Sequence, residues 1–318
     1  MTMEPVHRDA WVCEVGPRDG LQIISDIMPT AAKLEWIAAE AAAGVPEIEV
    51  CSFVPPKLLP QFADASEVAA AALRQPGLTV TALVPNLRGA ERAFESGVHK
   101  VNFVLSASES HNRQNVRRST AESLADFAHI VELRNSRPDW RAIQLCGGVS
   151  TSFGCTIEGE IPEDRVLELA ESYARAGADK ISIADTVGFA NPAQVKRMFT
   201  RLRDRLGKLP LTGHFHDTRG LGLANVYAAL EAGVHSFDAS LAGMGGCPWA
   251  PGATGNIVTE DLVFLLEGAG LRTGIDLDRL ITVREIVHAA LPNLPLQGAL
   301  AKAGRPKSLR GTPQPVNL

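Results

Sequence analysis

Two histidines stand two residues apart in the segment LTGHFHDT, residues 211–218. Apolar and polar residues alternate here, which is typical of a β-strand, and alternate residues of a strand face the same side. The side chains of His214 and His216 are therefore expected to converge, with their backbone positions roughly 6.5–7 Å apart. Two converging imidazoles either share a divalent metal ion or line a barrel as a hydrogen-bonded pair, and this segment alone leaves both interpretations open.

Two further residues that could bind a metal ion stand near the ends of other predicted strands. Asp19 follows the first predicted strand, Val12–Gly16, and Asn256 closes the glycine-rich loop GMGGCPWAPGATGN after the eighth. A carboxylate, an amide oxygen and two imidazoles would form a mixed oxygen and nitrogen site with open positions. Such a ligand set suits Mg²⁺, Mn²⁺, Co²⁺ or Zn²⁺, and the residue types do not choose among them.

Other residues near these strand ends carry groups that could act on a substrate. Arg18 could hold an oxyanion or a carboxylate, or it could form an ordinary surface ion pair with Asp19. Glu49 lies inside a predicted strand and needs a partner, because an unpaired buried carboxylate is costly. Asp185 ends the sixth predicted strand. Cys247 in the glycine-rich loop is either an acid or nucleophile with a tuned pKa or an incidental thiol.

A helix–strand unit recurs along the chain. Four segments share a helix end, a glycine, a small apolar residue and an alternating apolar strand: AAAGVPEIEV, FESGVHKVNF, ARAGADKISI and LEAGVHSFDA. Their spacing fits multiples of about 27 residues, and the glycine suits a helix C-terminus with a positive φ. With the gaps filled by pattern, the sequence predicts eight strands: Val12–Gly16, Glu47–Phe53, Thr79–Val84, Lys100–Ser106, Ala142–Val149, Lys180–Asp185, Leu211–His216 and Ser236–Leu241.

Eight strands that alternate with helices favour an α/β fold of the (β/α)8 TIM-barrel type. An open doubly wound sheet is the alternative, but its Gly-x-Gly-x-x-Gly turn is not matched by EVGPRDGLQ after the first strand. In a barrel the chemistry lies at the C-terminal ends of the strands, and the polar residues above collect at five of the eight predicted ends. They are therefore expected to meet at one mouth.

Composition narrows the class of partner. The net charge is −5 and no Lys/Arg run is present, which argues against binding to nucleic acid or to an anionic membrane surface. The sequence has no transmembrane stretch of 18 apolar residues, and MTMEPVHRDA lacks the features of a secretion signal. The five cysteines form no C-x-x-C pair, which argues against a disulfide scaffold or a zinc knuckle. We therefore expect a cytoplasmic protein.

The C-terminal part is expected to extend a single barrel domain that covers residues 1–318. Residues 262–318 form this extension, which is predicted to be helical as far as Ala290. Two prolines in LPNLPLQGA then break the helix, and the Pro-rich end AGRPKSLRGTPQPVNL is expected to be loose or ordered by a partner.

Five segments, in order, resemble the 3-hydroxy-3-methylglutaryl-CoA (HMG-CoA) lyases: EVGPRDGLQ, IEVCSFVPPK, ADTVGFANP, HFHDT and AGMGGCPWAPGATGNIVTEDLV. The likeness covers nearly the whole barrel, and its Gly-Pro-Arg-Asp-Gly-Leu-Gln and Gly-Gly-Cys-Pro elements are specific to this branch of a metal-dependent barrel superfamily. The resemblance implies cleavage of HMG-CoA to acetyl-CoA and acetoacetate, as in leucine degradation. It also implies an acyl-CoA substrate, a Mg²⁺ or Mn²⁺ ion and a homodimer.

The resemblance further implies a role for each candidate residue. The metal ligands would be Asp19, His214, His216 and Asn256. The residues that contact the substrate would be Arg18, Gln22 and Ser52. Arg18 would stabilise the enolate of acetyl-CoA, and Glu49 would orient Arg18. Asp185 would serve proton transfer near the substrate hydroxyl, and Cys247 would protonate the enolate carbon.

The sequence departs from the family in two places near the expected substrate. The family's Leu-Gln-Asn-Glu is Leu-Gln-Ile-Ile at residues 21–24, and the segment CGGVSTSFGCTIEGE has Gly148 at about a tyrosine's place and Thr156 at a proline's. An altered acyl pocket keeps citramalyl-CoA, cleaved to acetyl-CoA and pyruvate, as an alternative substrate. A synthase-type transferase would need a C-terminal domain larger than the residues after Leu262, and a non-catalytic acyl-CoA binder would show no metal dependence.

Overall fold

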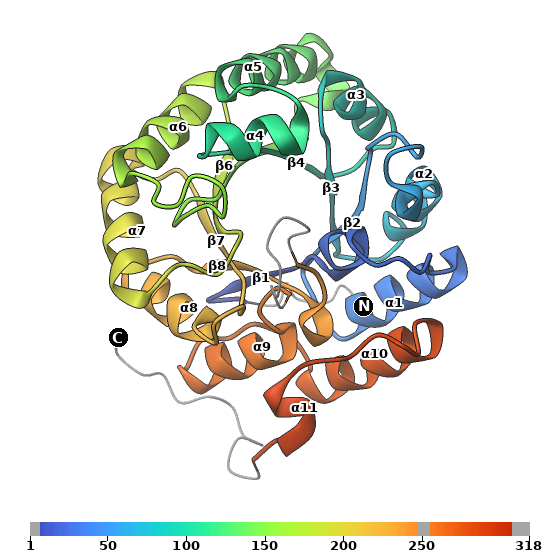
Figure 1. Cartoon of the computed structure of the whole chain (residues 1–318). Coiled ribbons are helices and arrows are strands. Elements are labelled where there is room, and N and C mark those ends of the chain that lie inside the picture. The colour runs from blue at the N-terminus through green and yellow to red at the C-terminus, as the bar shows by residue number, and fades with distance from the viewer. Residues whose placement is uncertain (1–6, 247–254, 307–318) are drawn as a thin grey trace.

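The computed structural model describes residues 7–246 and 255–306. Eight parallel strands pair in sequence order and β1 pairs with β8, so the sheet closes into a barrel inside a ring of helices (Figure 1). This pairing confirms the (β/α)8 barrel, because the edge strands of an open doubly wound sheet would not meet. The strands are β1 (Trp11–Glu14), β2 (Glu47–Ser52), β3 (Thr79–Leu83), β4 (Lys100–Ser106), β5 (Gln144–Ser150), β6 (Lys180–Asp185), β7 (Leu211–Phe215) and β8 (Ser236–Ala239).

All eight predicted strands are present, and their ends differ from the prediction by at most two residues. β1 ends early because the chain turns into a single π-helical turn, η1 (Gly16–Gly20). β8 ends early because a 3-10 turn, η4 (Leu241–Gly243), follows it. Both turns lie at the C-terminal ends of their strands, where the polar residues were expected to meet.

Helices follow each strand and bury apolar faces against it. The four glycines of the sequence repeat have φ angles from 77° to 105° and stand just ahead of β2, β4, β6 and β8, as the repeat predicted. The helices are α1 (Thr30–Ala42), α2 (Ala65–Ala72), α3 (Leu87–Glu95), α4 (Glu109–Val116), α5 (Thr120–Ser136), α6 (Glu163–Ala176), α7 (Pro192–Leu206), α8 (Gly222–Glu231), α9 (Thr259–Gly268), α10 (Leu277–Ala290) and α11 (Ala299–Ala303).

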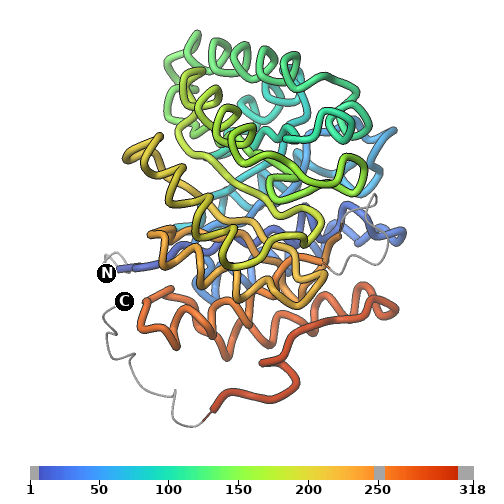
Figure 2. Tube along the Cα trace, turned by 60° about the vertical axis from the view of Figure 1, so that its left-hand side comes forward, coloured from blue at the N-terminus to red at the C-terminus, as the bar shows by residue number. Residues whose placement is uncertain are grey.

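The C-terminal helices add a flank to the barrel. α9 follows β8 and completes the helical ring, α10 packs against α1, and α11 packs against α9. In Figure 2 these helices, in orange and red, lie along one side of the barrel. The helix expected as far as Ala290 is interrupted between α9 and α10, where Gly270 and Gly274 have φ angles of 83° and 73°.

A buried polar cluster fills the barrel at the N-terminal ends of the strands. Lys100 and Glu47, each 3 % exposed, form an ion pair there. The Glu47 carboxylate also accepts hydrogen bonds from Trp11 Nε1 at 2.7 Å and Thr81 Oγ1 at 2.9 Å. Because these charges are paired and hydrogen-bonded, side chains fill the barrel at the N-terminal ends of its strands. The site is therefore expected at the C-terminal ends.

Two predictions from composition can be compared with the described residues. In that part of the chain, no helix is both long and apolar enough to cross a bilayer. Four cysteines fall there, and all are buried free thiols: Cys13, Cys51, Cys146 and Cys155.

Candidate active site

The turn η1 brings Arg18 and Asp19 to the mouth of the barrel. The backbone N–H groups of Arg18, Asp19 and Gly20 all donate to the carbonyl of Val15, at 3.1, 2.6 and 3.3 Å. Gly16 is required at the start of this turn, because a Cβ there would lie 2.5 Å from the Glu14 carboxylate and 2.7 Å from the Trp36 ring. Single π-helical turns of this kind are frequent at functional sites.

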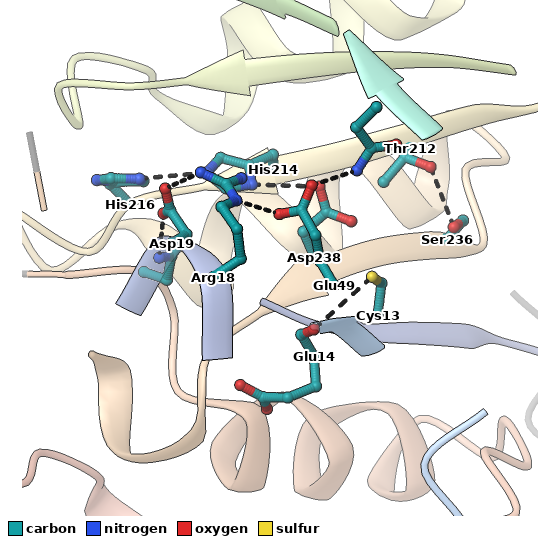
Figure 3. Close-up of polar contacts among 12 residues, drawn as sticks. Cys13, Glu14, Arg18, Asp19, Glu49, Thr212, His214, His216, Ser236 and Asp238 are labelled. Carbon is teal, nitrogen blue, oxygen red and sulfur yellow. Dashed lines mark hydrogen bonds and ion pairs between the residues drawn. The ribbon is translucent and has the colours of Figure 1, made fainter. Parts of the chain in front are cut away.

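Asp19, His214 and His216 converge at the mouth, with their ligand atoms all within 4.8 Å of one another. The two histidine Nε2 atoms are 3.2 Å apart, and His214 Nδ1 lies 3.2 Å from Asp238 Oδ2 (Figure 3). A carboxylate that accepts from one ring nitrogen leaves the other nitrogen free as a ligand atom. This arrangement is that of a candidate metal centre.

Asn256 completes the cluster. Its Nδ2 donates to Asp19 Oδ2 at 2.7 Å and to the carbonyl of Met244 at 3.1 Å. Its Oδ1 is buried and has no hydrogen-bond partner in the described part of the chain. A buried amide oxygen without a partner is costly unless it meets a donor or a cation, so the four residues fit a divalent ion bound through oxygen and nitrogen atoms.

The charge states suit this interpretation. Burial alone would raise the pKa of Asp19, but Arg18, His214 and His216 outweigh burial and lower it to about 2. Burial, together with the neighbouring His214, lowers the pKa of His216 to about 4. Burial opposes a charge on His214 as well, yet the Asp238 carboxylate raises its pKa. At neutral pH Asp19 is therefore ionised and His216 is neutral, which are the forms that bind metal ions.

Arg18 is held in one orientation from two sides. Its Nε donates to Glu49, and its Nη1 donates to Asp19 Oδ1 at 2.6 Å. Glu49 is fully buried and also accepts from Asn102 Nδ2 at 2.8 Å. Burial raises the pKa of Glu49, and Arg18 and Asn102 partly counter that effect. The expectation that Glu49 would pair with Arg18 is confirmed, and the guanidinium is positioned beside the candidate metal centre.

A cavity of about 730 Å³ extends from this cluster across the mouth. Arg18, Asp19, Gln22, His214 and His216 line it, so five of the residues predicted from the sequence face one space. This volume lies within the range of small-molecule and cofactor sites.

Two of the predicted site residues are placed differently. Ser52 is fully buried, and neither Ser52 nor Asp185 is among the described residues that line the cavity. The Asp185 carboxylate accepts from the backbone N–H groups of Phe189 at 2.8 Å and Ala190 at 3.1 Å. Burial raises the pKa of Asp185 to about 6 despite these two bonds. Asp185 therefore holds the loop after β6, whose residue Thr186 does line the cavity. Cys247, the predicted acid, lies outside the described residues.

Sequence reasoning missed three residues that hold the site together. Asp238 orients His214, and Asn102 supports Glu49. Glu14 accepts from the backbone of Gly16 at 2.7 Å and of Leu241 at 2.8 Å, so it joins η1 to η4. Each is a polar residue inside a predicted strand, and that was the available signal.

The fold and the site together indicate the class of protein. It is a TIM-barrel enzyme with a candidate divalent metal centre, formed by an Asp-His-His-Asn cluster beside a fixed arginine at the mouth. The sequence model of the HMGL-like family matches residues 10–287, most of the chain. The chain belongs to this family.

Individual relatives agree with this assignment. The chain is 40 % identical to the hydroxymethylglutaryl-CoA lyase of Bacillus subtilis over 92 % of its own length and 98 % of the relative's. It is 42 % identical to the (R)-citramalyl-CoA lyase of Chloroflexus aurantiacus, over 92 % and 94 %. The solved structure of an HMG-CoA lyase from Acinetobacter baumannii, in complex with coenzyme A and 3-methylmalate, superimposes with a TM-score of 0.88 at 45 % identity, covering 96 % and 98 %. The chain is therefore a carbon–carbon lyase.

Proposed function

We propose that this protein cleaves HMG-CoA to acetyl-CoA and acetoacetate with a divalent metal ion held by Asp19, His214, His216 and Asn256. The observation that carries the proposal is this cluster beside Arg18 in a cavity of about 730 Å³. The HMG-CoA lyases that the chain matches over nearly their whole lengths support the choice of substrate.

The reaction removes the proton of the C3 hydroxyl, breaks the C2–C3 bond and protonates C2 of the resulting acetyl-CoA enolate. A bound divalent ion would supply a Lewis acid for the hydroxyl and carboxylate oxygens of the substrate. Arg18 would donate hydrogen bonds to the enolate oxygen, which carries the developing charge. Glu49 keeps the guanidinium in place, so little reorganisation is needed when that charge appears.

Two proton-transfer roles complete the proposal. Cys247 would deliver the proton to C2, as the family resemblance implies. Asp185 would serve the proton transfer at the C3 hydroxyl by accepting that proton, as the resemblance implies, and its pKa of about 6 leaves the carboxylate mostly ionised near pH 7. The backbone N–H groups of Phe189 and Ala190 hold this carboxylate in the loop after β6, next to Thr186, which lines the cavity.

Incubation of the purified protein with HMG-CoA tests the proposal. With Mg²⁺ or Mn²⁺ it should form acetoacetate and acetyl-CoA in equal amounts, and chelation should abolish product that either ion restores. If acetoacetate is absent with every divalent ion tried, including Co²⁺ and Zn²⁺, the proposal is wrong. Comparing the four ions also identifies the preferred metal.

Citramalyl-CoA is the second candidate substrate, because Gly148 of β5, which lines the cavity, stands at about the place of a tyrosine in the family. The citramalyl-CoA lyase relative is as similar to the chain as the HMG-CoA lyases are. Pyruvate from citramalyl-CoA, measured against acetoacetate from HMG-CoA at equal enzyme concentration, decides between the two substrates.

We also propose a homodimer in the cytoplasm and a place in leucine degradation, as the resemblance implies. Light scattering of the purified protein measures the oligomeric state.

A further inference from the structure

A second polar cluster lies at the mouth, away from the candidate metal centre. Ser106 ends β4, Ser150 ends β5, and His111 belongs to α4, which lies over this part of the barrel (Figure 1). Ser106 Oγ is 2.7 Å from His111 Nδ1 and 2.8 Å from Ser150 Oγ. Ser150 Oγ donates to the carbonyl of Leu105 at 3.1 Å. The four groups form one continuous hydrogen-bonded chain.

The direction of this chain follows from counting protons. A carbonyl can only accept, so Ser150 uses its single hydroxyl proton on Leu105. Ser150 Oγ must then accept from Ser106, and Ser106 Oγ must accept from His111 Nδ1–H. In a neutral imidazole the other nitrogen, Nε2, is left without a proton and acts as an acceptor. In the opposite direction Ser150 would donate its hydroxyl proton to Ser106, and its hydrogen bond to the carbonyl of Leu105 would be lost.

The second ring nitrogen of His111 is a buried polar atom in a residue that lines the ligand cavity. The residue is 3 % exposed and lines the cavity of about 730 Å³. Nε2 is buried and has no hydrogen-bond partner in residues 7–246 and 255–306. Burial lowers the pKa of His111, although Glu158 acts in the opposite direction, and this keeps the ring neutral near pH 7. A buried acceptor in this position is costly unless a ligand donates to it.

We propose that His111 Nε2 accepts a hydrogen bond from the bound acyl-CoA, and that the chain through Ser106 and Ser150 fixes the tautomer that makes this possible. The inference rests on the proposed function for the nature of the ligand. HMG-CoA offers two kinds of donor that a neutral acceptor inside the cavity could bind: the donors of the pantetheine arm, which are two amide N–H groups and one hydroxyl, and the C3 hydroxyl of the acyl group. The thioester carbonyl and the carboxylate are excluded because they only accept.

His111→Phe is the informative variant. The ring keeps its approximate volume, and Ser106 can still donate to Ser150, so no serine hydroxyl proton is left without an acceptor. His288→Phe on α10 is the matched control, because His288 is exposed and distant in sequence from the site. Thermal unfolding of both variants verifies that they fold.

Three kinds of ligand separate the two donors in the holoenzyme with Mn²⁺. The first is HMG-CoA itself. The second is a set of three HMG-CoA analogues: in two of them one or the other arm amide is replaced by an ester, and in the third the arm hydroxyl is replaced by hydrogen. The third is 3-methylglutaryl-CoA, which lacks the C3 hydroxyl. KM is measured for the substrates, and calorimetry gives the dissociation constant of 3-methylglutaryl-CoA. A neutral hydrogen bond corresponds to a factor of about 5 to 10 in these constants.

If His111 accepts from a donor of the arm, His111→Phe should weaken the binding of HMG-CoA and of 3-methylglutaryl-CoA alike by that factor, and the one analogue that lacks this donor should be unaffected. If it accepts from the C3 hydroxyl, the binding of HMG-CoA and of all three analogues should weaken while that of 3-methylglutaryl-CoA is unchanged. Either outcome supports the proposal. Equal weakening of every ligand, which a packing role would give, or no weakening of any ligand, overturns it.

Nitrogen NMR of the ligand-free protein gives an independent readout that requires no catalysis. The His111 resonances, assigned by their loss in His111→Phe, should show a protonated Nδ1 and an unprotonated Nε2 at neutral pH. Ser106→Ala should shift this tautomer balance, whereas a protonated Nε2 in the unmutated protein would contradict the inference. The calorimetry and the NMR remain interpretable even if HMG-CoA is not cleaved, so the two proposals fail separately.

Discussion

Replacing Asp238 with asparagine tests the electrostatic logic of the candidate metal centre. The Asp238 carboxylate can only accept, so the ring proton of His214 lies on Nδ1 and the lone pair of Nε2 points toward His216 and Asp19. An asparagine amide can instead donate to Nδ1. That exchange moves the ring proton to Nε2 and turns a ligand atom into a hydrogen-bond donor.

The expected loss of Mn²⁺ affinity follows from the usual effect of a hydrogen bond that orients a metal-binding histidine. Both side chains are mostly buried, 13 % exposed for Asp238 and 12 % for His214, so water offers little compensation. Loss of a residue that orients a metal-binding histidine typically lowers metal affinity 10- to 100-fold, which is about 1.4 to 2.8 kcal/mol. We therefore expect Asp238→Asn to bind Mn²⁺ 10- to 100-fold more weakly at neutral pH.

Calorimetric titration of the metal-free protein with Mn²⁺ measures this directly. Asp139→Asn is the control, because it makes the same chemical change at a side chain that is 59 % exposed. If Asp238→Asn folds and binds Mn²⁺ within twofold of the control, the tautomer argument is refuted. A fall in activity at unchanged Mn²⁺ affinity would refute it equally, since the argument acts through Nε2 as a ligand.

Three further predictions concern the residues around the centre. Arg18→Lys should lower kcat by a factor of about 10² to 10³ with a much smaller change in KM, because lysine cannot keep the bonds to Glu49 and Asp19 and still reach the enolate. Steady-state kinetics of acetoacetate formation measures both constants, and a change confined to KM would contradict this prediction. Asp185 has a pKa raised from 3.8 to about 6, so its titration contributes stability that is fully present below pH 3.8 and is lost as pH rises through about 6. Relative to Asp185→Asn, the unmutated protein should therefore lose up to about 3 kcal/mol of unfolding free energy between pH 4 and pH 7, measured in urea, and a difference independent of pH would exclude this. Glu14→Ala leaves the buried N–H groups of Gly16 and Leu241 without an acceptor, so the free energy of unfolding should fall by about 3 kcal/mol and the urea midpoint should fall with it. An unchanged midpoint would show that Glu14 does not join the two turns.

Much of the barrel and of the site could be read from local patterns. The recurring glycine and the short apolar runs after it located the strands, because a helix end with positive φ followed by a strand is a local feature. The two-residue spacing of His214 and His216 placed both rings on one face without any knowledge of the fold. Barrel architecture then brought Asp19 and Asn256 to the same end, since the C-terminal ends of parallel strands share one mouth.

Side-chain direction was harder to derive at a strand end. Asp185 was predicted to act in the cavity, but β6 turns Ser182 and Ala184 toward the cavity and buries Ile181 and Ile183 on its other face. Alternation places Asp185 on the same face as the isoleucines, and its carboxylate still lies close enough to His214 for their charges to interact. The sequence alone does not say which parity of a strand faces the inside of a barrel, so the role of Asp185 in proton transfer stays a prediction.

The remaining site residues depend on register between strands, which no local pattern contains. His214 pairs with Asp238 across β7 and β8, and Ser106 pairs with Ser150 across β4 and β5. A shift of one residue in either pair would turn one partner toward the other face of the sheet and break the bond. In a closed barrel the registers of all the strand pairs are linked through one shear, so they cannot shift independently. The carboxylate that orients His214 and the hydroxyls that orient His111 are therefore fixed by the same global property of the fold, although they belong to different strand pairs of the barrel.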